Sequence, residues 1–257
     1  MKDYHDLYLK TDVKILADVF ETFRELCMKD YGLDPVHMVS LPGFTWHAAL
    51  KKTGVELELL QDIDKHLFVE AGVRGGVSMI SKRYSKANNK YLDTYDPSQE
   101  SKYLMYLDCN SLYATVMCED LPTGGFKWVT KDEFINNKNY GYILEVDLEY
   151  DKELHDHHND YPLAPERING KLVPNLNNKT KYVLHYEALS KYLELGLRVT
   201  KYHRILQFEQ SAWLKPYIEF NINKRKEAKS AFEIEFYCIF SSGDVTLPAI
   251  VVYSDIL

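Results

Sequence analysis

The hydrophobic residues of this chain repeat with two different periods, and this mixture limits the possible folds more than any other feature of the sequence. In the first segment they recur at alternating steps of four and three, at Leu9, Val13, Leu16, Phe20, Phe23 and Cys27. That spacing predicts a helix with one apolar stripe, ended by Gly32 and Pro35. From Tyr142 to Leu148 apolar and acidic residues alternate, which predicts a half-solvated strand. Because no unit repeats along the chain, we predict a mixed α+β fold.

Further elements follow from local signals. Residues 103–107 are all aromatic or aliphatic, which predicts a buried strand. We expect this strand to pair near the strand at 142–148. The other expected elements are helices at 45–52 (ended by Gly54), 185–195 (ended by Gly196) and 216–236, a short helix from Asn110 or Ser111 through Met117, and a strand at 198–208.

The composition restricts the class of protein. The chain has 257 residues, of which 46% are hydrophobic, so it can bury at least one core. Its four cysteines show no C-x-x-C spacing and no signal peptide is recognisable, which favours a reduced, intracellular protein. No stretch approaches the roughly 18 to 20 apolar residues that span a bilayer, so we expect no membrane insertion.

Charge is distributed unevenly along the sequence. The net charge of -7 argues against a generally basic nucleic-acid coat. However, five basic residues and no acidic residue lie between Ala71 and Lys90, whereas eight carboxylates and one lysine lie between Glu145 and Glu166. The basic run is therefore the candidate surface for nucleic acid.

The sharpest chemical feature is the segment Tyr106-Leu-Asp-Cys-Asn-Ser-Leu-Tyr113, in which Asp108 ends the predicted strand and a turn leads into a helix. Phosphoryl transfer with two Mg²⁺ ions needs carboxylates on rigid backbone, and a strand end supplies that rigidity. An Asp in this position is also a common helix cap or turn residue. For Tyr113, the alternative to a functional role is an ordinary core tyrosine.

The pattern D-x-x-S-L-Y, formed by Asp108, Ser111, Leu112 and Tyr113, resembles motif A of the family B DNA polymerases, most of all the protein-primed kind of viruses, linear plasmids and large DNA transposons. The resemblance implies that Asp108 and the backbone carbonyl of Cys109 bind Mg²⁺. It implies that Ser111, Leu112 and Tyr113 bind the incoming dNTP, with the Tyr113 ring as a steric gate against ribose. Many members have proline after this tyrosine, whereas this chain has Ala114.

Two later segments resemble the transposon and organellar branch of the same family. Leu121 to Trp128 is similar to the segment that follows motif A, and 202–229 is similar to the approach to motif B. There the resemblance implies that Arg225 and Lys229, which are spaced i and i+4, hold the triphosphate. The alternative is a solvated face of a charged helix.

Near the start, Tyr8 and Asp12 match the Y-x-x-x-D pattern of the third exonuclease motif of proofreading domains. Positions i and i+4 share a helix face, so the phenol and the carboxylate can point at one phosphate. Chance spacing is the alternative. The other exonuclease acids would precede Met1, and we therefore expect no proofreading by this chain.

Gly72 to Gly76 lies where the family places its Gly-Gly linker motif, which contacts the template backbone. Glycine has no Cβ and permits close approach of a phosphate. With the basic run that follows, this predicts DNA contacts from Arg74, Gly75, Gly76, Lys82 and Arg83. A glycine turn under a basic surface loop is the alternative.

The resemblance covers residues 4 to 233 and then stops, because no N-S-x-Y-G turn follows. Beyond this point we expect a frameshift, a retained intron or a mispredicted gene, and Tyr253 to Asp255 resembles motif C only faintly. Between these regions, His155 to His158 has no partner at metal-ligand spacing, and we predict a surface segment there.

The resemblance implies an α+β chain with the end of a ribonuclease H-like exonuclease domain (1–35), a linker region (36–100), an incomplete polymerase palm (101–210), the start of the fingers (211–236) and a non-family tail (237–257). The implied function is template-directed addition of dNTPs to a primer on primer-template DNA, with a terminal protein as a further partner, in the nucleus or at a site of viral replication. One carboxylate cannot place two metals. The alternative is therefore an inactive remnant that only binds DNA, and a free-standing nuclease is a weaker third hypothesis.

Overall fold

The computed structural model describes residues 1–136 and 139–241, which form two compact units. Among the described residues, unit 1 combines Met1–Leu57, Tyr113–Leu121 and 211–241, and unit 2 combines Glu58–Leu112 with Pro122–Gln210. Each unit is assembled from distant parts of the sequence, so the units cut across the linear segments predicted above. Within the described residues, no helix is long and apolar enough to cross a membrane.

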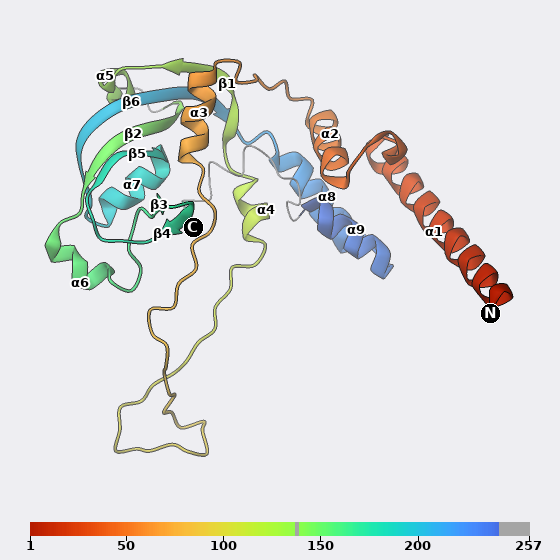
Figure 1. Ribbon diagram of the computed structural model, residues 1–257, viewed down its shortest axis with the longest axis horizontal. Coiled ribbons are helices and arrows are strands. Elements are labelled where there is room, and N and C mark those ends of the chain that lie inside the picture. The colour runs from red at the N-terminus through yellow and green to blue at the C-terminus, as the bar shows by residue number, and fades with distance from the viewer. Residues whose placement is uncertain (137–138, 242–257) are drawn as a thin grey trace. The chain divides into compact units, whose positions relative to one another are not determined.

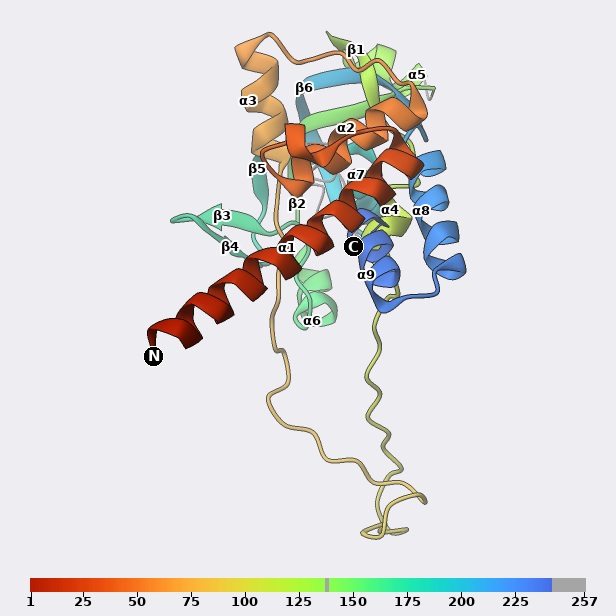
Figure 2. The ribbon, with the colours of Figure 1, turned by 90° about the vertical axis from the view of Figure 1, so that its right-hand side faces the viewer.

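Unit 1 is helical. It contains α1 (Lys2–Tyr31), the 3-10 turn η1 (Pro35–His37), α2 (Leu41–Thr53), most of the short α4 (Leu112–Val116), α8 (Lys215–Glu227) and α9 (Ala231–Ser241). Helices α8 and α9 pack side by side (Figure 2). The predicted end of the first helix is confirmed, because Gly32 has a φ of 63°, in the left-handed region that glycine tolerates best.

The core of unit 1 is aromatic and involves only the last turns of α1. Tyr31 stacks on Phe240 with ring centroids 5.2 Å apart. The Phe240 ring also contacts the rings of Phe44 and Phe236, at centroid distances of 5.7 and 4.4 Å. The apolar stripe predicted for the first helix exists, but its N-terminal half is exposed. Leu16, for example, keeps 70% of its surface accessible.

The single helix predicted from Pro216 to Phe236 is wrong, because the chain breaks after α8 and restarts at Ala231. Ser230 and Glu233 form a capping box: the Glu233 N–H donates to Ser230 Oγ at 3.1 Å, and the Ser230 N–H donates to Glu233 Oε2 at 3.2 Å. Tyr237 and Phe240 are buried. The tail expected to be foreign from residue 237 therefore contributes to the core as far as α9, and its remaining part, 242–257, lies outside the described residues.

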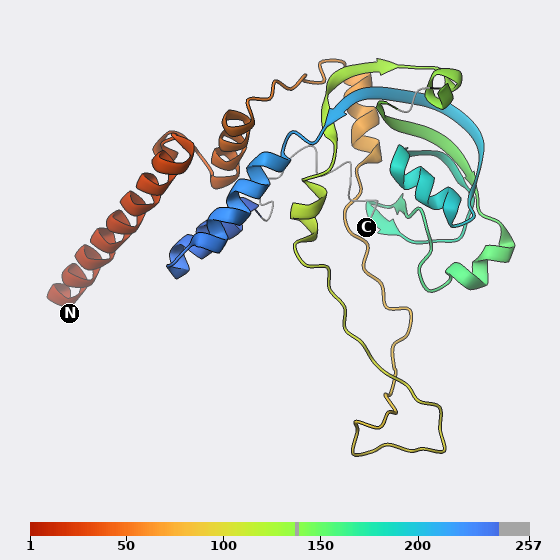
Figure 3. The ribbon, with the colours of Figure 1, turned by 180° about the vertical axis from the view of Figure 1, so that it is seen from behind.

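Unit 2 is built on a four-stranded sheet in the order β1 (Leu121–Trp128), β6 (Arg198–Ser211), β2 (Gly141–Glu149) and β5 (Lys179–His185). Strand β2 pairs antiparallel with both β5 and β6, so Leu144 lies between Leu184 and Ile205. Strands β2 and β6 curve around α7 (Tyr186–Glu194), as Figures 1 and 3 show.

The sheet of unit 2 is covered on both faces. Leu144 and Leu189 belong to the larger cluster, on the side of α7, and Ile143 packs with Phe68 of α3 (Ile63–Gly72) in the smaller one. Smaller elements complete the unit: α5 (Lys131–Asn136), η2 (Lys152–Leu154), α6 (His155–His158), and the hairpin β3 (Glu166–Ile168) to β4 (Lys171–Val173).

The strand predicted at 142–148 is confirmed as β2, but the prediction that one of its faces is open to solvent is wrong. Glu145 is only 8% exposed. Arg204 on β6 compensates this charge, since its Nε and Nη2 donate to the two carboxylate oxygens at 2.9 and 3.1 Å. The same guanidinium lies 4.7 Å from the centroid of the Phe68 ring.

The buried strand predicted at 103–107 is also wrong. The side chains there are between 55% and 95% exposed, and the segment has no regular structure. It belongs to a long loop that leaves α3 and returns to α4 (Figure 2), with an isolated bridge between Asn88 and Lys102 near its tip. Strand β2, the expected partner, already pairs on both sides with β5 and β6.

Candidate functional site

The motif A segment lies where the long loop returns to α4. Asp108 and Cys109 are exposed and lie in irregular backbone just before α4. Ser111 has a φ of 53°, and this left-handed residue turns the chain into α4, which begins at Leu112. Asp108 is therefore carried by irregular backbone, and the strand that was expected to hold it rigidly is not formed.

Tyr113 is the second residue of α4 and lies on its first turn. Its side chain is 63% exposed, whereas Ala114 and Met117 are buried. The alternative of a core tyrosine is thus excluded. The ring is open to a ligand on one side of a short helix whose other side is packed.

Mg²⁺ binding by these residues can be tested against the available ligands. Asp108 supplies one exposed carboxylate, and Cys109 supplies a backbone carbonyl. Within residues 1–136 and 139–241, no group of three or more His, Cys, Asp and Glu side chains is arranged to hold a metal ion. A two-metal site needs more oxygen ligands than this. The described residues do not by themselves fit such a site, and we assign no metal-dependent step to them.

Arg74 is not an exposed cation as the basic run predicted. It is 8% exposed, and its Nη1 donates to the carbonyl oxygens of Val183 at 2.6 Å and Gly72 at 3.3 Å. Its guanidinium lies 3.9 Å from the centroid of the Tyr182 ring. These contacts attach the start of the long loop to β5, so Arg74 has a positioning role in this structure.

The remaining residues predicted to contact DNA are exposed. At Gly75 and Gly76, an added Cβ would meet no atom within 4 Å, so the backbone there is open to a close approach. The basic strip, which we define as Lys82, Arg83, Lys86 and Lys90, is exposed along its length. Lys82 has only a long ion pair, 4.0 Å, with exposed Asp160.

The predicted triphosphate ligands do not share a helix face. Arg225 is exposed on α8, but Lys229 lies in the break between α8 and α9, where its backbone N–H donates to Glu233 at 3.0 Å. Lys224, which precedes Arg225, forms an ion pair with Asp30, and its Nζ donates to Asp30 Oδ1 at 2.7 Å. Arg225 is thus the exposed cation that α8 offers among these three.

Tyr8 and Asp12 lie one turn apart on α1, as predicted, and both are exposed. The Tyr8 ring stacks on Tyr4 with centroids 6.4 Å apart. Their exonuclease role stays a prediction, and Tyr253 to Asp255, the faint motif C, lies outside the described residues.

His158 is not the surface residue that the sequence suggested. It is 9% exposed, and its Nδ1 lies 2.8 Å from the hydroxyl of Tyr150. Burial lowers the pKa of His158, with a smaller effect from His157. His158 therefore anchors α6 to Tyr150, the residue that follows β2, while His157 is exposed.

Sequence reasoning also missed a pocket in unit 2 that is rich in aromatic residues. Its tyrosines come from separate elements, and they share a site only because β2, β6 and α7 converge. The available signal was the high tyrosine content of the chain, 20 residues, which does not indicate where they meet.

Comparison with known proteins gives one family and one fold. The family described as DNA polymerase type B, organellar and viral, matches residues 2–237. Among solved structures, Phi29 DNA polymerase complexed with primer-template DNA is similar at 14% identity and a TM-score of 0.53, over 85% of this chain and 36% of that one. An orthorhombic crystal form of Phi29 DNA polymerase is similar at 13% identity and a TM-score of 0.51, over 86% of this chain and 38% of that one. No curated protein matches.

The structural likeness, at such low identity, concerns the fold alone. This chain spans less than two fifths of the length of those structures. The family match passes Glu233, where the resemblance was expected to end, and reaches the buried part of α9.

Proposed function

Because the chain belongs to the type B DNA polymerases of the organellar and viral kind, we propose that it binds primer-template DNA and an incoming dNTP as part of template-directed DNA synthesis. The observation that carries the proposal is the D-x-x-S-L-Y segment at 108–113, which turns into α4 inside the family match. In this proposal Asp108 is the essential carboxylate of the motif, and the described residues do not complete a Mg²⁺ site around it.

The proposed parts follow the order of the family. Helix α1 belongs to the end of an exonuclease domain, the sheet of unit 2 belongs to the palm region, and α8 and α9 begin the fingers. Tyr113 selects deoxyribose because its exposed ring can pack under the sugar, where a 2′-hydroxyl would clash. Ser111 and Leu112 shape the same turn, and Arg225 holds the triphosphate. Protein priming, with a terminal protein as partner, is proposed from the family alone.

The DNA-binding part of the proposal rests on charge and access. A similar solved structure, Phi29 DNA polymerase, is complexed with primer-template DNA. In this chain Gly75 and Gly76 leave the backbone open, and the basic strip beyond them carries no acidic residue. Arg74 acts by holding the loop on β5.

Nucleotide incorporation on a primed template tests the catalytic proposal. Asp108→Ala is expected to reduce incorporation by about a hundredfold or more. Asp93→Ala, which removes an exposed carboxylate from the same loop, serves as the matched control. Tyr113→Ala is expected to retain dNTP incorporation and admit ribonucleotides. Equal activity of the Asp108 and Asp93 variants would contradict the assignment of Asp108.

A non-catalytic DNA-binding role is the second candidate, because the described residues supply only one carboxylate at the motif. A chain that binds primer-template DNA in a salt-dependent manner but incorporates nothing would favour it. Lys82→Gln and Arg83→Gln should each lower the slope of log affinity against log salt by roughly one. Lys201→Gln, an exposed cation on β6, should leave that slope unchanged.

A further inference from the structure

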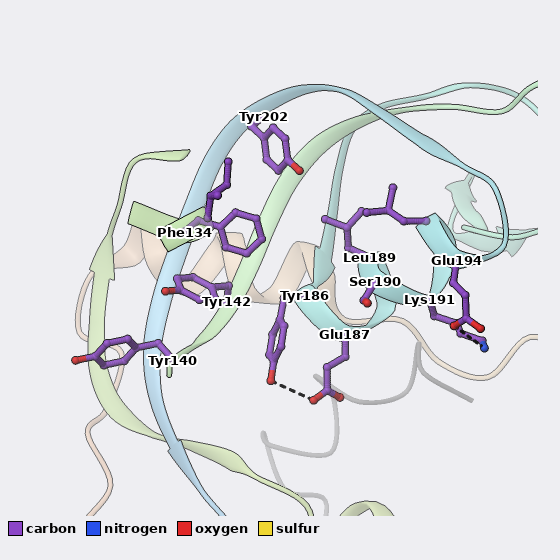
Figure 4. Close-up of a pocket in the computed structure, with 12 residues that line it drawn as sticks. Phe134, Tyr140, Tyr142, Tyr186, Glu187, Leu189, Ser190, Lys191, Glu194 and Tyr202 are labelled. Atoms are coloured by element: carbon purple, nitrogen blue, oxygen red, sulfur yellow. Dashed lines mark hydrogen bonds and ion pairs between the residues drawn. The ribbon is translucent and has the colours of Figure 1, made fainter. Parts of the chain in front are cut away.

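Unit 2 contains a pocket of about 670 Å³ between α5, β2, α7 and β6 (Figure 4). This volume is within the usual range of small-ligand sites, roughly 300 to 1,000 Å³. None of the residues predicted to bind metal, nucleotide or DNA lines it. Five aromatic residues do: Phe134, Tyr140, Tyr142, Tyr186 and Tyr202.

The rings meet at steep angles. Phe134 and Tyr142 have centroids 5.0 Å apart with planes at 80°, and Tyr142 and Tyr186 have centroids 6.3 Å apart with planes at 88°. In such contacts the edge of one ring covers the face of the other, and Tyr142 is only 2% exposed, so the rings that a ligand can reach are the half-buried ones, Phe134, Tyr140, Tyr186 and Tyr202. The face of an aromatic ring carries the negative part of its quadrupole, so a group with positive charge is the ligand that several accessible rings stabilise together.

The carboxylates on α7 differ in their partners. Glu194 pairs with Lys191 at 3.0 Å, but Glu187 accepts a hydrogen bond from the Tyr186 hydroxyl at 3.1 Å and pairs with no cation in the part of the chain that the structure describes. Figure 4 shows Glu187 beside Tyr186 at the pocket. The chain already places one ammonium on this ring cluster, since Lys131 Nζ lies 4.8 Å from the centroid of Tyr202.

We propose that this pocket binds an alkylated ammonium group, held by the half-buried rings of Phe134 and Tyr186 and by the carboxylate of Glu187. An anion would be repelled by Glu187, and a neutral apolar ligand would leave that charge unpaired. The chemistry is shared by free quaternary amines such as choline and by methylated lysine side chains. The site is independent of the proposed polymerase function, because it uses none of the same residues.

Choline and its uncharged carbon analogue 3,3-dimethylbutan-1-ol, which have the same shape, test the proposal by NMR titration of the full chain. Choline should bind about tenfold more tightly than the alcohol, and its methyl protons should shift upfield because they lie over ring faces. Equal affinity of the two compounds, or no binding of choline, would overturn the proposal.

Glu187→Gln localises the site, because it removes the charge and keeps the shape of an exposed side chain. It should weaken choline binding about fivefold or more and leave the alcohol unaffected. Glu153→Gln makes the same charge change in unit 2 outside the pocket and should alter neither affinity. An unchanged choline affinity in the Glu187 variant would contradict the proposed geometry.

A trimethyllysine peptide and its unmethylated counterpart identify the source of the group. Tighter binding of the methylated peptide than of choline assigns the pocket to a modified protein. Choline binding as tight as the peptide or tighter assigns it to a free amine. Either result requires the same loss of affinity in Glu187→Gln.

Discussion

At the scale of single residues, burial determines which polar side chains are structural. The sequence placed Arg74 and His158 at the surface, and both are inside unit 2, with hydrogen-bond partners on neighbouring elements. Their partners are 109 and 8 residues away along the chain, so no local pattern could reveal them. The proposed roles of Asp108 and Tyr113, by contrast, rest on a six-residue motif, which is local and can be read from the sequence alone.

His185 makes the stability of unit 2 depend on pH. It is 3% exposed, and burial lowers its pKa from 6.5 to about 3. Well above pH 6.5 the imidazole is neutral in both the folded and the unfolded state, so this residue adds no pH dependence there. As the pH falls below 6.5, His185 becomes protonated in the unfolded state but stays neutral in the folded state. The free energy of unfolding should then fall by up to roughly 1.4 kcal/mol per pH unit.

His185→Phe keeps an aromatic ring against Phe208 and removes the titration. Chemical denaturation at about pH 6.5 and about pH 5 should therefore show a smaller loss of stability in this variant than in the unchanged chain. His66→Phe, an exposed histidine on α3, is the matched control and should keep the original pH dependence. A loss of stability that is the same in all three proteins would show that His185 is accessible to protons in the folded state.

At the scale of elements, the hydrophobic period predicted the type of most helices and strands correctly, but it did not predict where they are interrupted. Helices form over 9–27, over 45–52 and over 186–194 of the predicted 185–195, and a strand forms over 198–208, because the apolar spacing of each segment matches its structure. The break at 228–230 and the hairpin turn at Asn169 and Gly170, with φ of 51° and 78°, were missed. Both have sequence signals, S-x-x-E and N-G, that a search for apolar periods passes over.

Ser230→Ala tests the capping box that starts α9. The change removes the oxygen that accepts from the Glu233 N–H, and it should lower the free energy of unfolding by about 1 kcal/mol. The measurement is chemical denaturation followed by helical circular dichroism. Ser101→Ala, at an exposed position without regular structure, is the control and should have no effect. An equally small effect of both changes would mean that α8 and α9 behave as one continuous helix.

At the scale of the whole molecule, the units could not be predicted because each joins segments that are distant in sequence. The segment that precedes the motif illustrates this. Residues 103–107 have the composition of a buried strand, but a strand also needs partners, and β2 is already paired on both sides. Composition alone therefore predicted the wrong neighbour for β2.

The exposed state of residues 103–107 leads to a prediction about self-association. Leu104 and Tyr106 are 57% and 95% exposed, and a long apolar segment without strand partners favours association between chains. Leu104→Thr with Tyr106→Thr should reduce light scattering at high concentration. It should change the free energy of unfolding by no more than about 0.5 kcal/mol, since these side chains lie outside both hydrophobic clusters of unit 2.

Leu144→Ala, at a position with no exposed surface, sets the scale for a packed strand and should cost about 2 to 5 kcal/mol. A comparable loss in the double variant at 104 and 106 would show that the segment is packed in solution, as its composition predicted. Asp108 would then stand at the end of a strand, and its carboxylate would have the rigid support that a metal ligand needs. The same denaturation experiment therefore decides both the state of the loop and the support of the motif that follows it.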